Sequence, residues 1–80
     1  MGSDDQQDAM LDAQGLKCPL PVLRARKAIK SVEIGGELTV LATDPAAPKD
    51  FKAFSEQAGH ELVSSAKTDD VFTFVLRRGR

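Results

Sequence analysis

The chain has 80 residues, of which 41% are hydrophobic and 29% are charged, as expected for one small globular domain with a thin core. Only four phenylalanines and no tryptophan or tyrosine are present, so the core must be mostly aliphatic. A net charge of -1 gives no electrostatic reason to expect nucleic-acid binding, and a single cysteine excludes an internal disulfide and any zinc site built from several cysteines.

The first eight residues, MGSDDQQD, are polar and acidic. We expect a disordered tail over residues 1–8 and a single domain over residues 9–80. The tail lacks the basic and apolar regions of a secretory signal, and no apolar run approaches the roughly 20 residues of a membrane helix. A lone free thiol fits a reducing compartment. These features predict a cytoplasmic protein with no membrane partner.

The first half of the domain predicts one strand and one helix. Residues 10–13 form a short strand that ends at the turn signal Gln14-Gly15. A helix is predicted from Pro19 to about Val32, because apolar residues recur there at spacings of three and four. Prolines are tolerated in the first helical turn, where a missing N–H leaves no hydrogen bond unmade.

The second half predicts one strand, one helix and a closing hairpin. Residues 38–43 alternate as in a strand, and a helix begins near Pro48 and stops at Gly59. Strands over residues 60–67 and 71–77 follow, joined by a turn at residues 68–70. The order predicts an α/β (α+β) two-layer sandwich of βαβαββ order, in which a four-stranded mixed sheet carries two helices on one face.

The most informative stretch is Leu16-Lys17-Cys18-Pro19-Leu20-Pro21. Cys18 falls at the predicted start of a helix, where free N–H groups and the helix dipole favour negative charge. Lys17 adjoins it, and Arg24 and Lys27 follow on the helix. We therefore expect a lowered pKa for the thiol. Pro19 and Pro21 stiffen the chain around the sulfur and support it in a fixed, exposed position.

A single exposed thiolate suits sulfur exchange with a partner. It can attack a persulfide on another protein and leave with the outer sulfur, and without a second cysteine it cannot act as a dithiol redox centre. The alternative is that Cys18 is a small buried hydrophobe, as many free cysteines are. Its Pro-x-Pro context favours the functional interpretation.

The segment Leu11-Asp12-x-x-Gly15-Leu16-x-Cys18-Pro19-x-Pro21 resembles the signature of the TusA/SirA family of small sulfur-carrier proteins. The later Ala42-Thr43-Asp44-Pro45, Lys49-Asp50-Phe51 and Gly59-His60-Glu61-Leu62 are also similar to that family. The resemblance covers about residues 10–79, and its Cys-Pro-x-Pro element is the specific part.

The resemblance implies that Cys18 is the catalytic residue and carries a persulfide. Its sulfur would come from a cysteine desulfurase or similar donor and pass to an acceptor protein of a sulfur relay. Branches of the family serve tRNA 2-thiolation, molybdenum-cofactor assembly, sulfur oxidation or selenium metabolism. The pyridoxal phosphate would belong to the desulfurase, so this chain is expected to bind no cofactor and no metal, and to act as a monomer.

Six residues are candidates for partner binding: Leu20, Arg24, Lys27, Asp44, Lys49 and Asp50. Leu20 stands where the tRNA-thiolation branch typically has Glu, and Lys49 stands where that branch often has Arg. The resemblance therefore does not specify the protein that accepts the sulfur. The basic stripe of the first helix, formed by Arg24, Arg26, Lys27 and Lys30, is either a solvated face or a dock for an acidic partner. Asp44 either orients the loop facing Cys18 or only shapes a turn. Lys49 and Asp50 either touch a partner or belong to a solvated helical turn.

Two other functions compete with sulfur transfer. The domain could be a non-catalytic regulatory or interaction module that uses the same fold as a docking surface. It could also bind nucleic acid through the basic helix and the terminal Arg77, Arg78 and Arg80, but it lacks tryptophan and tyrosine for base stacking, so direct nucleic-acid binding is not expected. The only histidine, His60, is expected to be structural or on the surface.

Overall fold

The structure, a computed structural model, describes residues 8–80. The elements in chain order are β1 (Asp8–Ala13), α1 (Leu20–Ala28), a 3-10 turn η2 (Ile29–Ser31), β2 (Glu37–Ala42), α2 (Ala47–Ala58), β3 (Glu61–Thr68) and β4 (Val71–Arg77). The predicted disordered tail falls on residues 1–7, outside the described part, and on Asp8, which begins β1.

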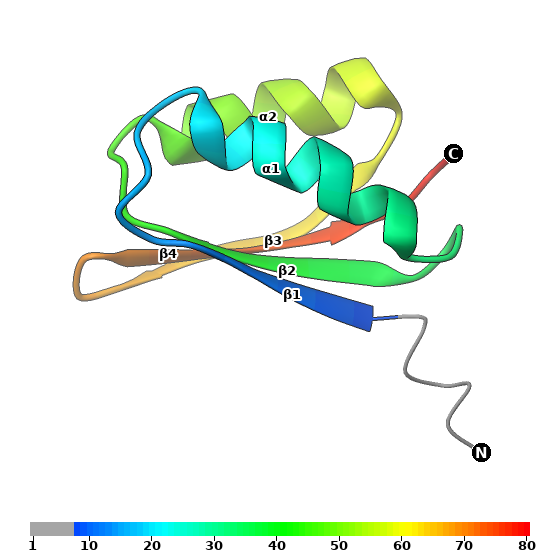
Figure 1. Cartoon of the computed structure of the whole chain (residues 1–80), viewed down its shortest axis with the longest axis horizontal. Coiled ribbons are helices and arrows are strands. Elements are labelled where there is room, and N and C mark those ends of the chain that lie inside the picture. Colours follow the sequence, from blue (N-terminus) through cyan, green and yellow to red (C-terminus); the bar gives the residue numbers. More distant parts are fainter. Residues whose placement is uncertain (1–7) are drawn as a thin grey trace.

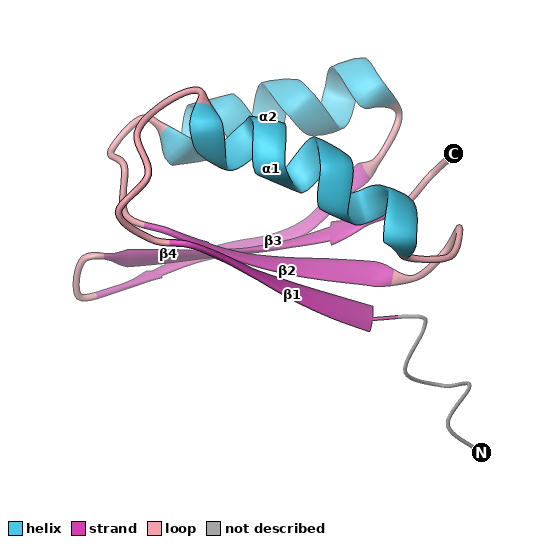
Figure 2. Ribbon diagram, viewed as in Figure 1, coloured by secondary structure: helices cyan, strands magenta, loops and turns pink. Residues whose placement is uncertain are grey.

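The four strands form one mixed sheet in the order β1-β2-β4-β3. β1 pairs in parallel with β2, and β4 pairs antiparallel with both β2 and β3. Both helices cover the same face of this sheet (Figure 1), so the molecule has one layer of helices on one layer of strands (Figure 2). The predicted two-layer βαβαββ sandwich is confirmed.

Element ends differ from the prediction by a few residues, for local reasons. The first helix is α-helical only to Ala28 and tightens into a 3-10 turn before Val32. The second helix closes on Gly59, which has a positive φ of 80° that suits glycine. The His60 N–H then donates to the Ser55 carbonyl at 2.9 Å, so His60 belongs to the helix cap and β3 begins at Glu61.

The core lies between the helices and the sheet and is mostly aliphatic, as the composition requires. Along β2, Leu38, Val40 and Ala42 are buried while the residues between them are only partly covered. They pair with Leu76, Phe74 and Phe72 of β4, which face the same way. The aromatic centre is Phe51 of α2, which stacks on Phe74 with ring centroids 4.7 Å apart.

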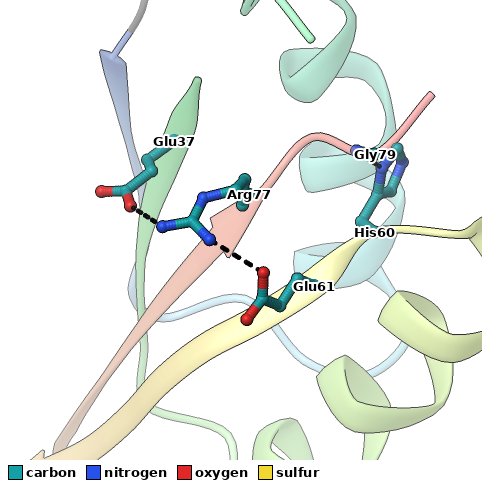
Figure 3. A network of polar contacts seen from close by, with 5 residues as sticks. All are labelled: Glu37, His60, Glu61, Arg77 and Gly79. Carbon is teal, nitrogen blue, oxygen red and sulfur yellow. Dashed lines mark hydrogen bonds and ion pairs between the residues drawn. The ribbon is translucent and has the colours of Figure 1, made fainter. Parts of the chain in front are cut away.

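The opposite face of the sheet carries an ion-pair network near the end of β4 (Figure 3). Arg77 contacts Glu37 at 3.2 Å and Glu61 at 2.9 Å, and so links β4 to both of its neighbours. Because Leu38 and Leu76 point to the core, Arg77 and Glu37 point away from the helices. The side chains are partly exposed, so the pairs add little to stability.

Candidate functional site

The site is formed by two loops at one end of the sheet. Because β1 and β2 are parallel, their carboxyl ends lie at the same end of the sheet, and the loops that follow them start there. The Gly15 N–H donates to Thr43 Oγ1 at 2.9 Å, and the Cys18 N–H donates to Asp44 Oδ2. Two hydrogen bonds therefore tie the loop that carries the cysteine to the loop after β2.

Asp44 both orients the loop that carries Cys18 and shapes the turn before α2, the two roles that the sequence presented as alternatives. One carboxylate oxygen accepts the hydrogen bond from Cys18, and the other accepts one from the Ala46 N–H at 3.2 Å. Its carbonyl also accepts from the Ala47 N–H at 2.9 Å, at the first residue of α2. One side chain thus shapes the turn before α2 and positions the backbone of Cys18.

Cys18 is a free, exposed thiol just before α1. The Cys18–Pro19 peptide bond is cis, and Pro19 caps the helix, with its carbonyl accepting from the Leu23 N–H at 3.1 Å. Pro21 is buried in the first turn of the helix. The alternative of a buried, inert cysteine is therefore wrong: the sulfur is presented at the surface by a rigid segment.

The predicted lowering of the Cys18 pKa is wrong, and the reason lies on α2. The Asp50 carboxylate accepts a hydrogen bond from the thiol, and this contact is the main cause that raises the pKa of Cys18 above its ordinary value. Desolvation and the negative charges of Asp50 and Asp44 act in the same direction. Packing of α2 against α1 brings Asp50 to the sulfur, and the loop before α2 brings Asp44, so both carboxylates favour the protonated thiol.

A groove runs from Cys18 between the two helices, with a volume of about 170 Å³ beside the thiol. It is lined by Cys18, Pro19, Val22 and Arg26 from the first helix and its start, and by Asp50, Ala53, Phe54 and Gln57 from the second. Arg26 was predicted only as a member of the basic stripe on the first helix and not as a residue that lines the site with Cys18. The signal that identifies it is its spacing of four from Val22, which places the two side chains on one face of the helix that Cys18 precedes.

A second hollow opens on the other side of the thiol, with a volume of about 350 Å³. Its lining consists of Gly15, Leu16, Lys17, Cys18, Thr43, Asp44 and Pro45. Lys17, predicted to support the thiol, therefore lies in a hollow with Cys18 and Asp44. Cys18 is accessible from both sides, which suits a group that a partner must reach.

The other predicted residues are exposed around these hollows. Leu20 is 44% exposed, which leaves an apolar side chain at the surface two positions after the thiol. Arg24 and Lys27 are exposed on α1 but line neither hollow that contains Cys18. Lys49 is exposed in the first turn of α2 and also lines neither. The thiol is thus held in a defined position, and exposed charged side chains lie outside the two hollows that contain it.

His60 lies apart from the thiol, as expected for a structural residue. Its Nδ1 accepts a hydrogen bond from the Gly79 N–H at 3.0 Å (Figure 3), and its ring packs against Phe54 with centroids 5.7 Å apart.

Within residues 8–80, no group of three or more histidine, cysteine or acidic side chains is placed to hold a metal ion. No helix in the same range is long and apolar enough to cross a membrane.

An Asp50→Asn variant tests the thiol's environment. Removing the carboxylate charge should lower the pKa of Cys18 toward its ordinary value and raise the rate of iodoacetamide alkylation at neutral pH severalfold, since the thiolate is the nucleophile. The rate should be measured against pH. Asp69→Asn in the hairpin turn is the matched control, and equal rates in the two variants would contradict the assignment.

The sequence over residues 9–78 matches the family described as sulfurtransferase TusA. A candidate sulfur carrier protein of Neisseria meningitidis is 55% identical over 67 residues, which cover 84% of this chain and 90% of that protein. The sulfur carrier protein TusA of Allochromatium vinosum is 46% identical over 71 residues, covering 89% and 93%. The crystal structure of a SirA-like protein from Desulfitobacterium hafniense superposes with a TM-score of 0.77 at 30% identity, covering 90% of this chain and 99% of that one. The chain therefore belongs to the TusA family of sulfur carrier proteins.

Proposed function

We propose that this protein receives sulfur as a persulfide on Cys18 from a cysteine desulfurase or a similar donor and relays it to an acceptor protein. The observation that carries the proposal is the exposed thiol, fixed at the start of α1 by a backbone hydrogen bond to Asp44 and reachable from two hollows. The chain has no other cysteine, so every sulfur that it carries must pass through this position.

The transfer is an exchange at sulfur. The Cys18 Sγ attacks the outer sulfur of the donor persulfide, a new S–S bond forms on Cys18, and the donor's S–S bond breaks to release its thiolate. The proton of Cys18 passes to Asp50, which already accepts its hydrogen bond, and then to the departing donor thiolate. Donor persulfide and carrier thiol thereby become donor thiol and carrier persulfide, with no net oxidation.

We expect partner proteins to dock on the exposed residues near the thiol. Leu20 offers an apolar contact beside Cys18, and Arg24, Lys27 and Lys49 offer exposed positive charges around it. Pyridoxal phosphate belongs to the desulfurase in this scheme. We place the exchange in the cytoplasm, where a free thiol stays reduced, with the carrier acting as a monomer and without direct contact to nucleic acid.

The test is the mass of the intact protein after incubation with a cysteine desulfurase, pyridoxal phosphate and cysteine. A gain of one sulfur atom that a reductant reverses is the expected result. The persulfide-loaded carrier can then be offered to acceptors of tRNA 2-thiolation, molybdenum-cofactor assembly or other sulfur metabolism, one at a time. If no desulfurase or other persulfide donor loads the protein, the proposal is wrong.

Charge reversal at Arg24 and Lys27 tests the partner surface. An Arg24→Glu/Lys27→Glu variant should load with sulfur about tenfold more slowly at low salt, because complementary charges steer encounters between proteins. The loss should shrink as salt screens the charges. Rates should be compared with those of Lys52→Glu/Lys67→Glu, which reverses the same number of charges elsewhere. Equal rates in the two variants would remove Arg24 and Lys27 from the docking surface.

A further inference from the structure

A third hollow lies beside the groove that begins at Cys18, farther along the helix pair. Its volume is about 310 Å³. It is lined by Arg26, Ile29, Lys30, Phe54, Ala58, His60, Arg78 and Arg80. Arg26 and Phe54 also line the groove beside the thiol, and the Arg26 guanidinium lies over the Phe54 ring, 5.7 Å from its centroid, so this contact lies where the two neighbouring spaces meet. We call this far hollow the basic hollow.

The basic hollow gathers positive charge and has no acidic side chain in its lining, although Arg78 Nε donates to the main-chain oxygen of Arg80 at 2.9 Å. Four of its lining residues are arginine or lysine and none is acidic. Arg26, Lys30 and Arg80 form no ion pair with any residue in the described range 8–80. The carboxylates of Glu37 and Glu61, at the same end of the sheet, pair with Arg77 on the face away from the helices (Figure 3). The charge of the basic hollow is therefore left uncompensated by these side chains.

The cations are held in place by the segment after β4. Arg78 Nη1 donates to the carbonyls of Lys30 at 3.2 Å and Val32 at 2.7 Å, which fixes this segment to the end of the first helix. Gly79 donates to His60, and the Arg80 guanidinium lies so close to Gly59 that a Cβ there would come within 2.4 Å of its Nε. The basic hollow is a formed feature rather than a set of unrelated surface charges.

The groove has opposite charges at its two ends. Asp50 and Asp44 lie beside Cys18, while the cations lie at the basic hollow. Between them lie Val22, Ala53 and the ring of Phe54, with the Arg26 guanidinium over that ring. A ligand that lies along both spaces is therefore favoured by negative charge from Arg26 toward the basic hollow, by apolar groups against Val22, Ala53 and Phe54, and by a neutral end near the thiol.

We propose that this groove binds an extended segment of a partner protein, with acidic side chains in the basic hollow and a neutral end at Cys18. The inference rests on the proposed function only in naming the partner as a sulfur donor or acceptor. From Cys18 to Lys30 the helix rises about 15 to 20 Å, which about five extended residues span. Such a segment brings a cysteine at its neutral end to the thiol.

Other anions fit the groove less well. A nucleic acid carries negative charge along its whole length and would meet Asp44 and Asp50 at the thiol end. A free phosphate would leave the apolar floor of Ile29, Phe54 and Ala58 uncovered. A peptide alone combines a charged end with apolar side chains, which is what the walls require.

The test is a titration of the full chain, carrying Cys18→Ser to prevent disulfides, with a short peptide that has a run of glutamates at one end and a serine at the other. His60 is the only histidine and lines the basic hollow, so its ring resonance in NMR reports occupancy without ambiguity. We expect a saturable shift of this resonance with the acidic peptide and none with the glutamine version. Because the readout needs no sulfur, its failure is distinct from a failure of Cys18 to accept a persulfide.

Variants locate the contact. Lys30→Gln/Arg80→Gln should weaken peptide binding about tenfold, whereas the matched Lys52→Gln/Lys67→Gln should bind within about twofold of the parent. Three outcomes would overturn the proposal: no saturable shift with the acidic peptide, equal weakening in both double variants, or equally tight binding of single-stranded RNA or inorganic phosphate.

Discussion

A Cys18→Ser variant is expected to fold like the parent protein and to take up no sulfur at all. The thiol is exposed and Cys18 does not belong to the hydrophobic core, so exchanging sulfur for oxygen should leave stability nearly unchanged. Serine cannot hold a persulfide, and the chain has no second cysteine to replace it. The effect on loading is therefore complete. Thermal unfolding measures the stability of the variant, and its intact mass after incubation with the desulfurase measures its uptake of sulfur.

The same variant separates a carrier from a docking module. A module that works only by binding should keep its activity with serine at this position, since the shape of the surface is preserved. A carrier should lose activity entirely in any assay that follows sulfur to an acceptor. Retention of sulfur-dependent activity by the serine variant would rule out Cys18 as the carrier. If the parent protein fails with one desulfurase, other persulfide donors must be offered before the comparison is interpreted.

A Phe51→Ala variant should lose about 3–5 kcal/mol of unfolding free energy, since it opens a cavity in a closely packed core. Phe51 is fully buried, stacks on Phe74 at 4.7 Å and meets Phe54 edge-on at 6.5 Å. A chain of this length has a total stability of only about 4–12 kcal/mol, so much of it would be lost. Thermal unfolding followed by circular dichroism should show a fall in Tm of about 12–40 °C.

Leu23→Ala is the control for that experiment. Leu23 is 50% exposed on α1, and its truncation should cost less than about 1 kcal/mol. Similar losses in the two variants would mean that Phe51 does not hold the second helix to the sheet. Because Asp50 precedes Phe51 in the chain, loosening of this contact should also free the thiol from its carboxylate and speed its alkylation, in a protein that remains folded at low temperature.

The fold could be predicted because local signals agreed along the chain. The alternation at Leu38, Val40 and Ala42 gave the buried face of β2, and Gly59 gave the end of α2. The boundaries were less certain because they depend on tertiary contacts. β1 begins at Asp8 because its backbone pairs with β2 from that residue onward, and no feature of MGSDDQQD predicts this pairing.

The site was predicted only in part. The position of Cys18 before a helix followed from the two prolines, and its family signature followed from the neighbouring residues. The sign of its pKa shift did not follow, because it depends on Asp50, which lies 32 positions later and reaches the thiol through the packing of two helices. Sequence proximity favoured Lys17, Arg24 and Lys27, but the contact that dominates comes from another element.

The basic stripe shows the same limit. Four cations on one helix suggested a single surface, and the structure divides them. Arg26 lies in the groove with Cys18 and, together with Lys30, lines the basic hollow, while Arg24 and Lys27 line neither. The arginines that complete the hollow come from the end of the chain, and only the return of β4 beside β2 brings them there.

A carrier must also leave its donor, and the bonds that join the two loops bear on how quickly it does so. Because Gly15 and Cys18 are already tied to Thr43 and Asp44, the loops have little freedom to lose when a partner arrives. Less ordering on association means that a small contact area is enough for recognition. Under the proposed function, a small contact area would give a short residence time, which would let one molecule collect sulfur and hand it over many times in succession.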